Sequence, residues 1–192
     1  MVDSHQDKKL QQLNMLIAMT ALINSTLDSA SIRKKAIEAA AKVLGTEAGS
    51  LLLIDPETGC LFFEATVGEK CDGIKSIRLD RGTGIAGFVA ETGEPFITND
   101  ARSDPRFFKG IDEITGFTTR NMICVPVRSR ERILGVLQAI NKNEGDFEYD
   151  DMVVLYALAN QVAIAIENAQ LHQAAITDSL TGLYHHKHFE VR

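Results

Sequence analysis

Residues 82–119 read GTGIAGFVAETGEPFITNDARSDPRFFKGIDEITGFTT. They contain two glycine-marked turns, each followed by the pattern of a short helix, and almost no sustained strand or helix periodicity. A compact domain rarely carries so long an irregular segment without a function for it. We therefore predict that residues 82–119 form one wall and the lid of a small-molecule pocket.

The composition predicts one globular domain with flanking helices, since 192 residues that are 45% hydrophobic and 24% charged can bury a core. A net charge of -6 without a cluster of lysine or arginine argues against a nucleic-acid partner. The first residues lack the layout of a secretory signal. We also expect no apolar run of membrane-spanning length, hence no membrane partner and a cytoplasmic location.

Helices are predicted at the N-terminal end. Residues 1–28 are expected to form a dimerisation and signalling helix, because apolar residues recur on a heptad spacing within 8–27. These are Leu10, Leu13, Ile17 and Leu27. Asn24 takes an a position, which is typical of a parallel two-stranded dimer; alternatively, this helix packs on its own domain. A second helix over 31–45, capped by Asp28 or a following serine, ends at Gly45.

From residue 49 the pattern changes to that of strands. We predict a hairpin with strands at 50–54 and 60–67 around the turn 55–59, and further strands at 75–79, 122–128 and 133–141. A long helix capped by Asp150 or Asp151 follows. It is apolar on two sides, so it is expected to pack on its sheet with one and on a partner with the other. Strands between terminal helices indicate an α+β fold.

Several separated motifs then occur in the order found in one known family. They are Gly-x-Gly-Ile-Ala-Gly-x-Val-Ala at 82–90, Asp-Pro-Arg-Phe at 104–107, Thr-Gly-Phe at 115–117 and Asn-Lys at 141–142. Over about residues 30–171 the chain resembles the GAF domains that regulate cyclic-nucleotide phosphodiesterases and some bacterial cyclases. The resemblance implies a GAF sensory domain over 29–172, with a central antiparallel sheet, terminal helices on one face and a ligand pocket on the other. It also implies cAMP or cGMP as the ligand, with no cofactor required.

The resemblance includes a signature of asparagine, lysine, phenylalanine, aspartate and glutamate. Its members here are Asn141, Lys142, Phe147 and Asp151, with Met152 in place of the glutamate. In GAF domains this signature is thought to hold a strand end to a helix start, so it implies a salt bridge between Lys142 and Asp151. The alternative is that Asp151 only caps a helix and Lys142 is a solvated charge.

A singly charged cyclic phosphate can be received by exposed amides at a helix start, here at Gly84, Ile85 and Ala86. A second short helix near 107–112 is expected to bring Phe108 and Asp112 over the ligand, with hydrogen-bonding groups for the ribose and the ring. The resemblance implies contacts from Ser50, Ile85, Ala86, Phe108, Asp112, Thr115, Thr119 and Gln138.

Three base-facing positions depart from the family. Thr66 and Val67 stand where some members have an aromatic residue and an aspartate, and Gln138 replaces a glutamate. Because a glutamine amide can donate or accept, Gln138 does not decide between adenine and guanine. Taken singly, many of the ten candidates are typical of a core or a turn.

The sequence supports haem, metal and thiol-based sensing less well than nucleotide binding. A haem or metal site is not expected, because the histidines lie outside the predicted core. They are His5, His172, His185, His186 and His188. Cys60 and Cys71 could approach only if residues 69–75 fold back, and Cys124 lies in a strand, so reduced thiols are expected. A redox sensor, a sensor of another small molecule and a ligand-free dimerisation module remain alternatives.

Residues 177–184, TDSLTGLY, resemble the opening of a GGDEF domain, the diguanylate cyclase module. We expect 173–192 to be a linker and the start of that domain. The sequence ends at Arg192, before that family's acidic loop, so this chain is not expected to catalyse phosphoryl transfer. His185 stands where the family has a guanine-reading asparagine; alternatively, these histidines belong to a solvated tail. The hypothesis is a homodimeric sensor, joined through its terminal helices, that controls a cyclase.

Overall fold

The computed structural model describes residues 29–69 and 74–176. Its centre is a six-stranded sheet in the order β3-β2-β1-β6-β5-β4, and every neighbouring pair is antiparallel. The strands are β1 (Thr46–Ile54), β2 (Leu61–Val67), β3 (Arg78–Leu79), β4 (Phe96–Thr98), β5 (Met122–Ser129) and β6 (Arg132–Lys142). The predicted α+β class and antiparallel sheet are confirmed.

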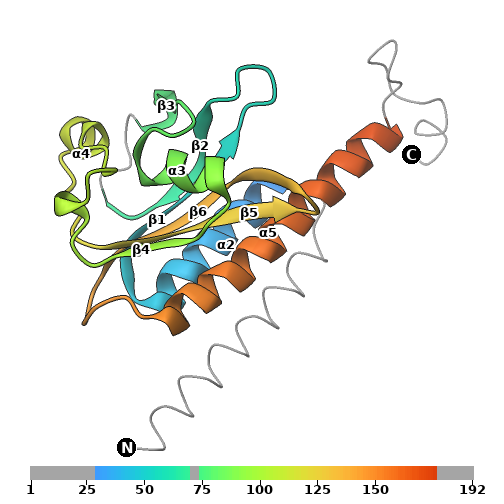
Figure 1. Ribbon diagram of the computed structural model, residues 1–192. Helices are drawn as coiled ribbons and strands as arrows, with labels where there is room; N and C mark the ends of the chain where they lie inside the picture. Colours follow the sequence, from blue (N-terminus) through green and yellow to red (C-terminus); the bar gives the residue numbers. More distant parts are fainter. Residues whose placement is uncertain (1–28, 70–73, 177–192) are drawn as a thin grey trace, which may run out of the picture.

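Two long helices, α2 (Ser29–Leu44) and α5 (Tyr149–Ile176), lie side by side on one face of the sheet (Figure 1). The shorter helices α3 (Gly84–Thr92) and α4 (Gly110–Thr115) lie toward the other face, with the 3-10 turns η1 (Ile74–Ser76) and η2 (Ala101–Ser103). Strand residues alternate between the two sides. Leu51 therefore packs in the core under α2 and α5, whereas Leu52 packs in a second core with α3.

The N-terminal half of the described chain follows its sequence pattern. The apolar face predicted for α2 is buried through Ala36, Ile37, Ala40 and Leu44. Gly45 follows the helix with a φ of 62°, a left-handed conformation that suits glycine at a helix end. In the hairpin turn, the Gly59 N–H donates to the Asp55 carbonyl oxygen at 2.8 Å, as expected for the predicted turn.

Two short strands differ from the prediction. The strand expected over 75–79 contains only Arg78–Leu79, because the preceding residues form the turn η1. The strand β4 was not predicted at all. Its three residues are too few to show an alternating pattern, and it exists because it pairs with the edge of β5.

The helix α5 begins at Tyr149, so the prediction that Asp150 or Asp151 precedes it as the cap is wrong. Asp151 is the third residue of the helix, and its carboxylate accepts a hydrogen bond from the Glu148 N–H at 3.0 Å. A carboxylate in the first turn of the helix thus accepts from the backbone N–H of the residue before the helix, as in a capping box. Asp151 therefore takes part in capping, but from inside the helix and not from the residue that precedes it.

The residues Tyr149–Leu171 of α5 are long and apolar enough to cross a membrane by length and composition alone, with a mean hydropathy of 1.4. The expectation that no apolar run reaches this length was therefore wrong. In the structure, one side of this helix packs on the sheet and on α2. The buried residues of that side include Leu155, Leu158, Val162 and Ile166. The core helix of a folded domain and a membrane span share this composition.

Several predictions concern residues outside those that the structure describes. They are the heptad helix over 8–27 with Asn24, the cap at Asp28, the position of Cys71 and the resemblance at 177–184. The proposed domain boundaries at 28 and 172 likewise stay predictions.

Candidate functional site

A hollow lies between the sheet and the segment 82–119, on the opposite side of the sheet from α2 and α5. Its volume is about 90 Å³, below the roughly 300–1,000 Å³ typical of small-molecule pockets, so a ligand of nucleotide size requires the cavity to open further. Apolar side chains form most of its walls. The candidates that line it are Ser50, Thr66, Val67, Ile85, Ala86, Phe108, Asp112, Thr115, Thr119 and Gln138. The structure thus brings all ten predicted positions to one cavity.

The floor of the cavity is a buried polar pair. Ser50 on β1 lies opposite Gln138 on β6, and the Ser50 hydroxyl donates to Gln138 Oε1 at 2.8 Å. The amide nitrogen of Gln138 donates to Cys124 Sγ at 3.7 Å, a long and weak bond. Because an amide nitrogen carries two hydrogens, Gln138 retains one donor for a ligand.

The start of α3 forms one wall of the cavity through Gly84, Ile85 and Ala86. The preceding residue, Thr83, makes no side-chain hydrogen bond to the helix, so no side chain caps the first amides. Gly84 has a φ of 70°, and a Cβ there would lie 3.0 Å from Phe108 Cβ. Both observations require glycine at this position. The result is an uncapped helix start against which an anion can be placed.

No lysine or arginine lines the cavity among the residues that the structure describes, and two acidic residues, Glu69 and Asp112, do. An anionic ligand would therefore depend on backbone amides rather than on a cationic side chain. This matches the expectation drawn from the sequence for a singly charged phosphate.

The lid differs from the prediction in where its helix begins. The helix α4 starts at Gly110, not at 107, and Phe108 precedes it with 40% of its surface exposed. Residues 104–107 form a turn instead, closed by the Phe107 N–H, which donates to the Asp104 carbonyl oxygen at 3.0 Å. The Arg106 guanidinium donates to the Asp104 carboxylate at 2.9 and 2.8 Å. These bonds stabilise the turn relative to the helix that was predicted here.

The Asp112 carboxylate accepts two hydrogen bonds from Thr119. The Thr119 hydroxyl donates to Asp112 Oδ1 at 2.7 Å, and the Thr119 N–H donates to Oδ2 at 2.9 Å. Arg102 also lies 3.6 Å from Asp112. The Thr115 hydroxyl donates to the Ile111 carbonyl oxygen at 2.8 Å. Asp112 and Thr115 were expected to face ribose hydroxyls and ring atoms, but here they hold the lid together, so a ligand contact would have to share or replace these bonds.

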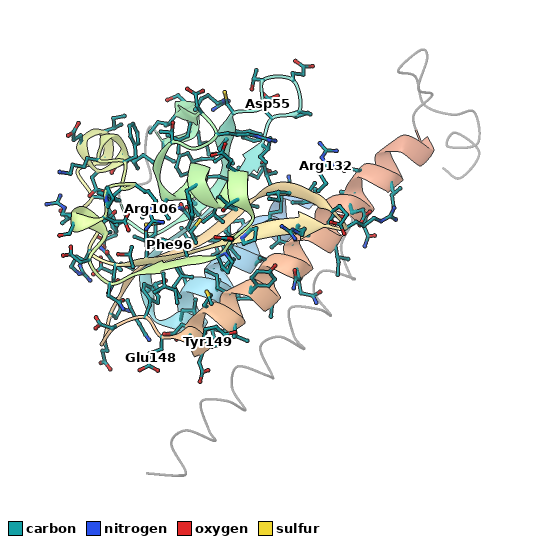
Figure 2. The ribbon with its side chains drawn as sticks, in the orientation of Figure 1. Asp55, Phe96, Arg106, Arg132, Glu148 and Tyr149 are labelled. Carbon is teal, nitrogen blue, oxygen red and sulfur yellow. The ribbon has the colours of Figure 1, made fainter. Side chains whose placement is uncertain are left out.

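Arg106 anchors the lid to the rest of the domain. Its guanidinium lies 3.9 Å from the ring centre of Phe96 (Figure 2). It also lies 4.9 Å from the ring centre of Phe88, so both contacts are cation–π arrangements. The same guanidinium lowers the pKa of the Asp104 carboxyl. Because that pKa is depressed, the stabilisation is present above the ordinary carboxyl pKa and is lost as the pH falls through the folded-state value. Arg106 belongs to the Asp-Pro-Arg-Phe motif at 104–107, but this anchoring role was not predicted from the sequence.

The signature residues lie away from the cavity. Lys142 forms the predicted ion pair with Asp151, and its ammonium group also donates to the Asp146 carbonyl oxygen at 2.9 Å. Asn99 brackets the backbone of Phe147, accepting from its N–H at 2.9 Å and donating to its carbonyl oxygen at 3.1 Å. The Lys142–Asp151 pair joins the end of β6 to the start of α5, which is the structural role that the resemblance implied, and the Asn99 bonds tie the segment after β4 to the loop between them.

Asn141 has a second role that the sequence did not indicate. Its side chain accepts from the Arg120 N–H at 2.7 Å and donates to the Thr118 carbonyl oxygen and to Glu47, each at 2.8 Å. Asn141 thereby ties the end of the lid to the strand β6. The bonds from Arg120 and then from Asn141 lower the pKa of the Glu47 carboxyl, so this stabilisation also weakens on acidification.

The two described cysteines differ in their expected reactivity. Burial raises the pKa of the Cys124 thiol to about 12, whereas Cys60 is partly exposed. We predict that iodoacetamide at pH 8 alkylates Cys60 in the folded protein and spares Cys124, whose thiolate fraction is roughly a thousandfold lower than that of an ordinary thiol. Peptide mapping by mass spectrometry measures both sites, and denatured protein, in which both sites should react, is the control. Fast labelling of folded Cys124 would contradict the buried position.

Residues 29–69 and 74–176 contain no group of three or more histidine, cysteine, aspartate or glutamate side chains that could hold a metal ion. The described site is therefore an apolar cavity with a helix start, a polar floor and a tied lid. This arrangement suits the binding of a small anionic molecule that carries a flat apolar part.

A family model described as "GAF domain" matches residues 26–167. The chain is 32% identical to a probable 3',5'-cyclic phosphodiesterase, pde-5, of Caenorhabditis elegans, over 72% of this chain and 20% of that protein. It is 31% identical to the dual 3',5'-cyclic-AMP and -GMP phosphodiesterase 11 of Drosophila melanogaster, over 86% of this chain and 12% of that protein. The chain thus spans only a small part of either relative.

The solved structures show the fold. The GAF domain of a phosphoenolpyruvate-protein phosphotransferase from Coxiella burnetii matches with a TM-score of 0.78 at 23% identity, over 86% of this chain and 98% of that one. At this identity the likeness concerns the architecture and not the ligand.

Proposed function

Because the chain belongs to the GAF domain family, we propose that it is a sensory domain that binds cAMP or cGMP in the cavity between its sheet and the segment 82–119. The domain is regulatory and is related to GAF regions of cyclic-nucleotide phosphodiesterases.

The uncapped start of α3 is the observation that carries this proposal. Gly84, Ile85 and Ala86 line the cavity there, and no lysine or arginine accompanies them among the described lining residues. A cyclic phosphate has one negative charge, which the backbone amides at a helix start can bind without a cationic side chain. The apolar walls offer a place for a purine, and the Ser50–Gln138 pair offers polar groups to its edge.

Phe108 is the residue we expect to cover the base. It lines the cavity, is partly exposed and touches the glycine at the helix start, so a nucleotide entering there must contact it or displace it. Stacking of a base on an aromatic ring contributes about 1–3 kcal/mol.

We predict that cAMP or cGMP, at about 100 times Kd, raises the free energy of unfolding by roughly 2.7 kcal/mol, which corresponds to about 5–11 °C in Tm. Each nucleotide is added separately to the 192-residue chain in a thermal melt. Phe108→Ala should weaken the affinity about 5- to 160-fold. Ile114→Ala is the matched control, since Ile114 is 61% exposed on the same lid and does not line the cavity. No shift with either nucleotide would refute the ligand assignment.

For the output we propose a homodimer in the cytoplasm that controls a diguanylate cyclase. The face of α5 that points away from the sheet exposes large apolar side chains at helical spacing. They are Tyr149, Val153, Ile164 and Leu171. Together with the heptad pattern over 8–27, this face supports association of two copies through terminal helices. The cyclase rests on the likeness of residues 177–184 to the opening of a GGDEF domain. A domain that dimerises and binds neither nucleotide would act as a relay module instead.

A further inference from the structure

The ligand cavity is closed to a molecule of nucleotide size. Its volume of about 90 Å³ lies well below the roughly 300 Å³ at which small-molecule pockets begin. One segment, residues 107–117, here called the flap, contributes much of the lining. The flap residues concerned are Phe107, Phe108, Ile111, Asp112, Thr115 and Phe117. Movement of the flap away from the sheet would therefore open the cavity.

Little apolar burial holds the flap. Of the residues 107–117, Asp112 alone is buried, with 7% of its surface exposed, and the others are half-buried or exposed. The flap includes α4, which lies at the margin of the domain, away from α2 and α5 (Figure 1). A segment with few buried apolar side chains opens at a low free-energy cost. The interactions that keep the flap closed are therefore largely polar.

Both ends of the flap are anchored. Before the flap, the Arg106 guanidinium lies over the ring of Phe96, 3.9 Å from its centre. After the flap, the Asn141 side chain accepts from the Arg120 N–H and donates to the Thr118 carbonyl oxygen. The flap can therefore move between two fixed points while the sheet beneath it stays in place.

We propose that the two hydrogen bonds from Thr119 to Asp112 form a latch that keeps the flap closed and controls the entry and exit of a ligand. Asp112 lies on the flap, whereas Thr119 is buried on the anchored side. The Thr119 hydroxyl donates to one carboxylate oxygen at 2.7 Å, and the N–H donates to the other at 2.9 Å. Arg102, which precedes the flap, lies 3.6 Å from the same carboxylate. Because hydrogen bonds to a charged group are stronger than those between neutral groups, one buried carboxylate can hold the segment.

A latch and a ligand contact have different kinetic consequences. A ligand can enter only while the latch is open, so a weaker latch raises the association rate. The ligand can also leave only while the latch is open, so the dissociation rate rises by a similar factor and the Kd changes little. Loss of a direct contact instead raises the dissociation rate alone. The control of ligand exchange rests on the proposed nucleotide site, whereas the latch itself does not.

Hydrogen exchange without a nucleotide tests the latch on the 192-residue chain. Thr119→Val removes the hydroxyl donor and keeps the shape of the side chain. We expect the flap amides to exchange about 10- to 100-fold faster, because a hydrogen bond to a charged group is lost. Thr118→Val is the matched control, since Thr118 is the exposed neighbour of Thr119. Mass spectrometry of peptides from the flap measures the exchange rate in each variant.

Urea distinguishes opening of the flap from unfolding of the whole domain. Flap opening exposes little surface, so low concentrations of urea should leave the exchange rate of the flap unchanged while that of β5 rises. Thr119→Ser restores a hydroxyl donor and should return the flap to within about threefold of the parent rate. Asp112→Asn weakens the same bonds and should also accelerate the flap. Equal rates in Thr119→Val and Thr118→Val would overturn the latch, and so would an equal urea dependence of the flap and β5.

Stopped-flow binding of fluorescent cAMP and cGMP tests the control of ligand exchange. In Thr119→Val, the association and dissociation rates should rise together by about tenfold or more, with the Kd within about threefold of the parent value. An unchanged association rate with a faster dissociation would overturn this control and assign Thr119 to a ligand contact. If neither nucleotide binds but the flap amides exchange as expected, the nucleotide assignment is refuted and the latch stands.

Discussion

Gly135→Ala is expected to lower the free energy of unfolding by more than about 3 kcal/mol, because the new methyl group overlaps backbone atoms that cannot move aside. Gly135 lies in β6 opposite Leu53 of β1, at the centre of the sheet. A Cβ at this position would overlap the Leu52 carbonyl oxygen and would lie 2.9 Å from Leu53 Cα. Relief would require the two central strands to separate, which breaks their ladder.

Thermal or urea denaturation measures this loss, which corresponds to a fall in Tm of at least about 6–12 °C for a domain of this size. Gly145→Ala is the matched control. Gly145 has a φ of 70°, and a Cβ there meets nothing within 4 Å. The free energy of unfolding of that variant should therefore fall only by the strain of an alanine in the left-handed conformation, about 1–2 kcal/mol. If the free energy of unfolding of Gly135→Ala lies within about 1 kcal/mol of the parent value, β1 and β6 are less closely paired than in this structure.

Lys142→Met is expected to lower the free energy of unfolding by about 3 kcal/mol, because it leaves the buried Asp151 carboxylate without its cation. The Lys142 and Asp151 side chains are only 11% and 4% exposed. The Glu148 N–H would remain as the hydrogen-bond donor to Asp151. Since this ion pair joins β6 to α5, the loss should appear in chemical denaturation as a lower midpoint with an unchanged slope.

The matched control is Lys34→Met. Lys34 pairs with Glu38 at 3.9 Å on the surface of α2, where the side chains are 65% and 52% exposed. Such a pair contributes about 0.5 kcal/mol or less. The double variant Lys142→Met, Asp151→Leu should lose less than Lys142→Met alone, because no uncompensated charge remains. If Lys142→Met costs no more than Lys34→Met, the ion pair contributes nothing specific to the junction.

The elements that the sequence predicted well are those with a long pattern. The helix α2 has sixteen residues with one apolar face, and the hairpin has two apolar strands around a turn with suitable residues. In both cases the interactions that decide the structure are local, or depend only on which face is apolar. The three-residue strand β4 has no such pattern and forms only because β5 offers it an edge.

The sequence predicted which positions line the cavity, but not which hydrogen bonds their side chains form. All ten candidates line one cavity, because ordered motifs identify positions in a fold. The hydrogen bonds of Asp112 to Thr119 were not foreseen, and neither was the anchor of Arg106 on two aromatic rings. These contacts depend on where a lid without periodicity closes, and that depends on the whole surface beneath it.

The amino-acid sequence alone was sufficient to identify residues 82–119 as the wall and lid of a pocket and to predict the α+β class, since glycine turns and apolar periods are properties of the chain itself. Only the tertiary structure decided that α3 starts uncapped against the cavity and that Ser50 meets Gln138 on its floor. The physical reason is that these features join residues distant in sequence, and such pairings form only when the sheet assembles.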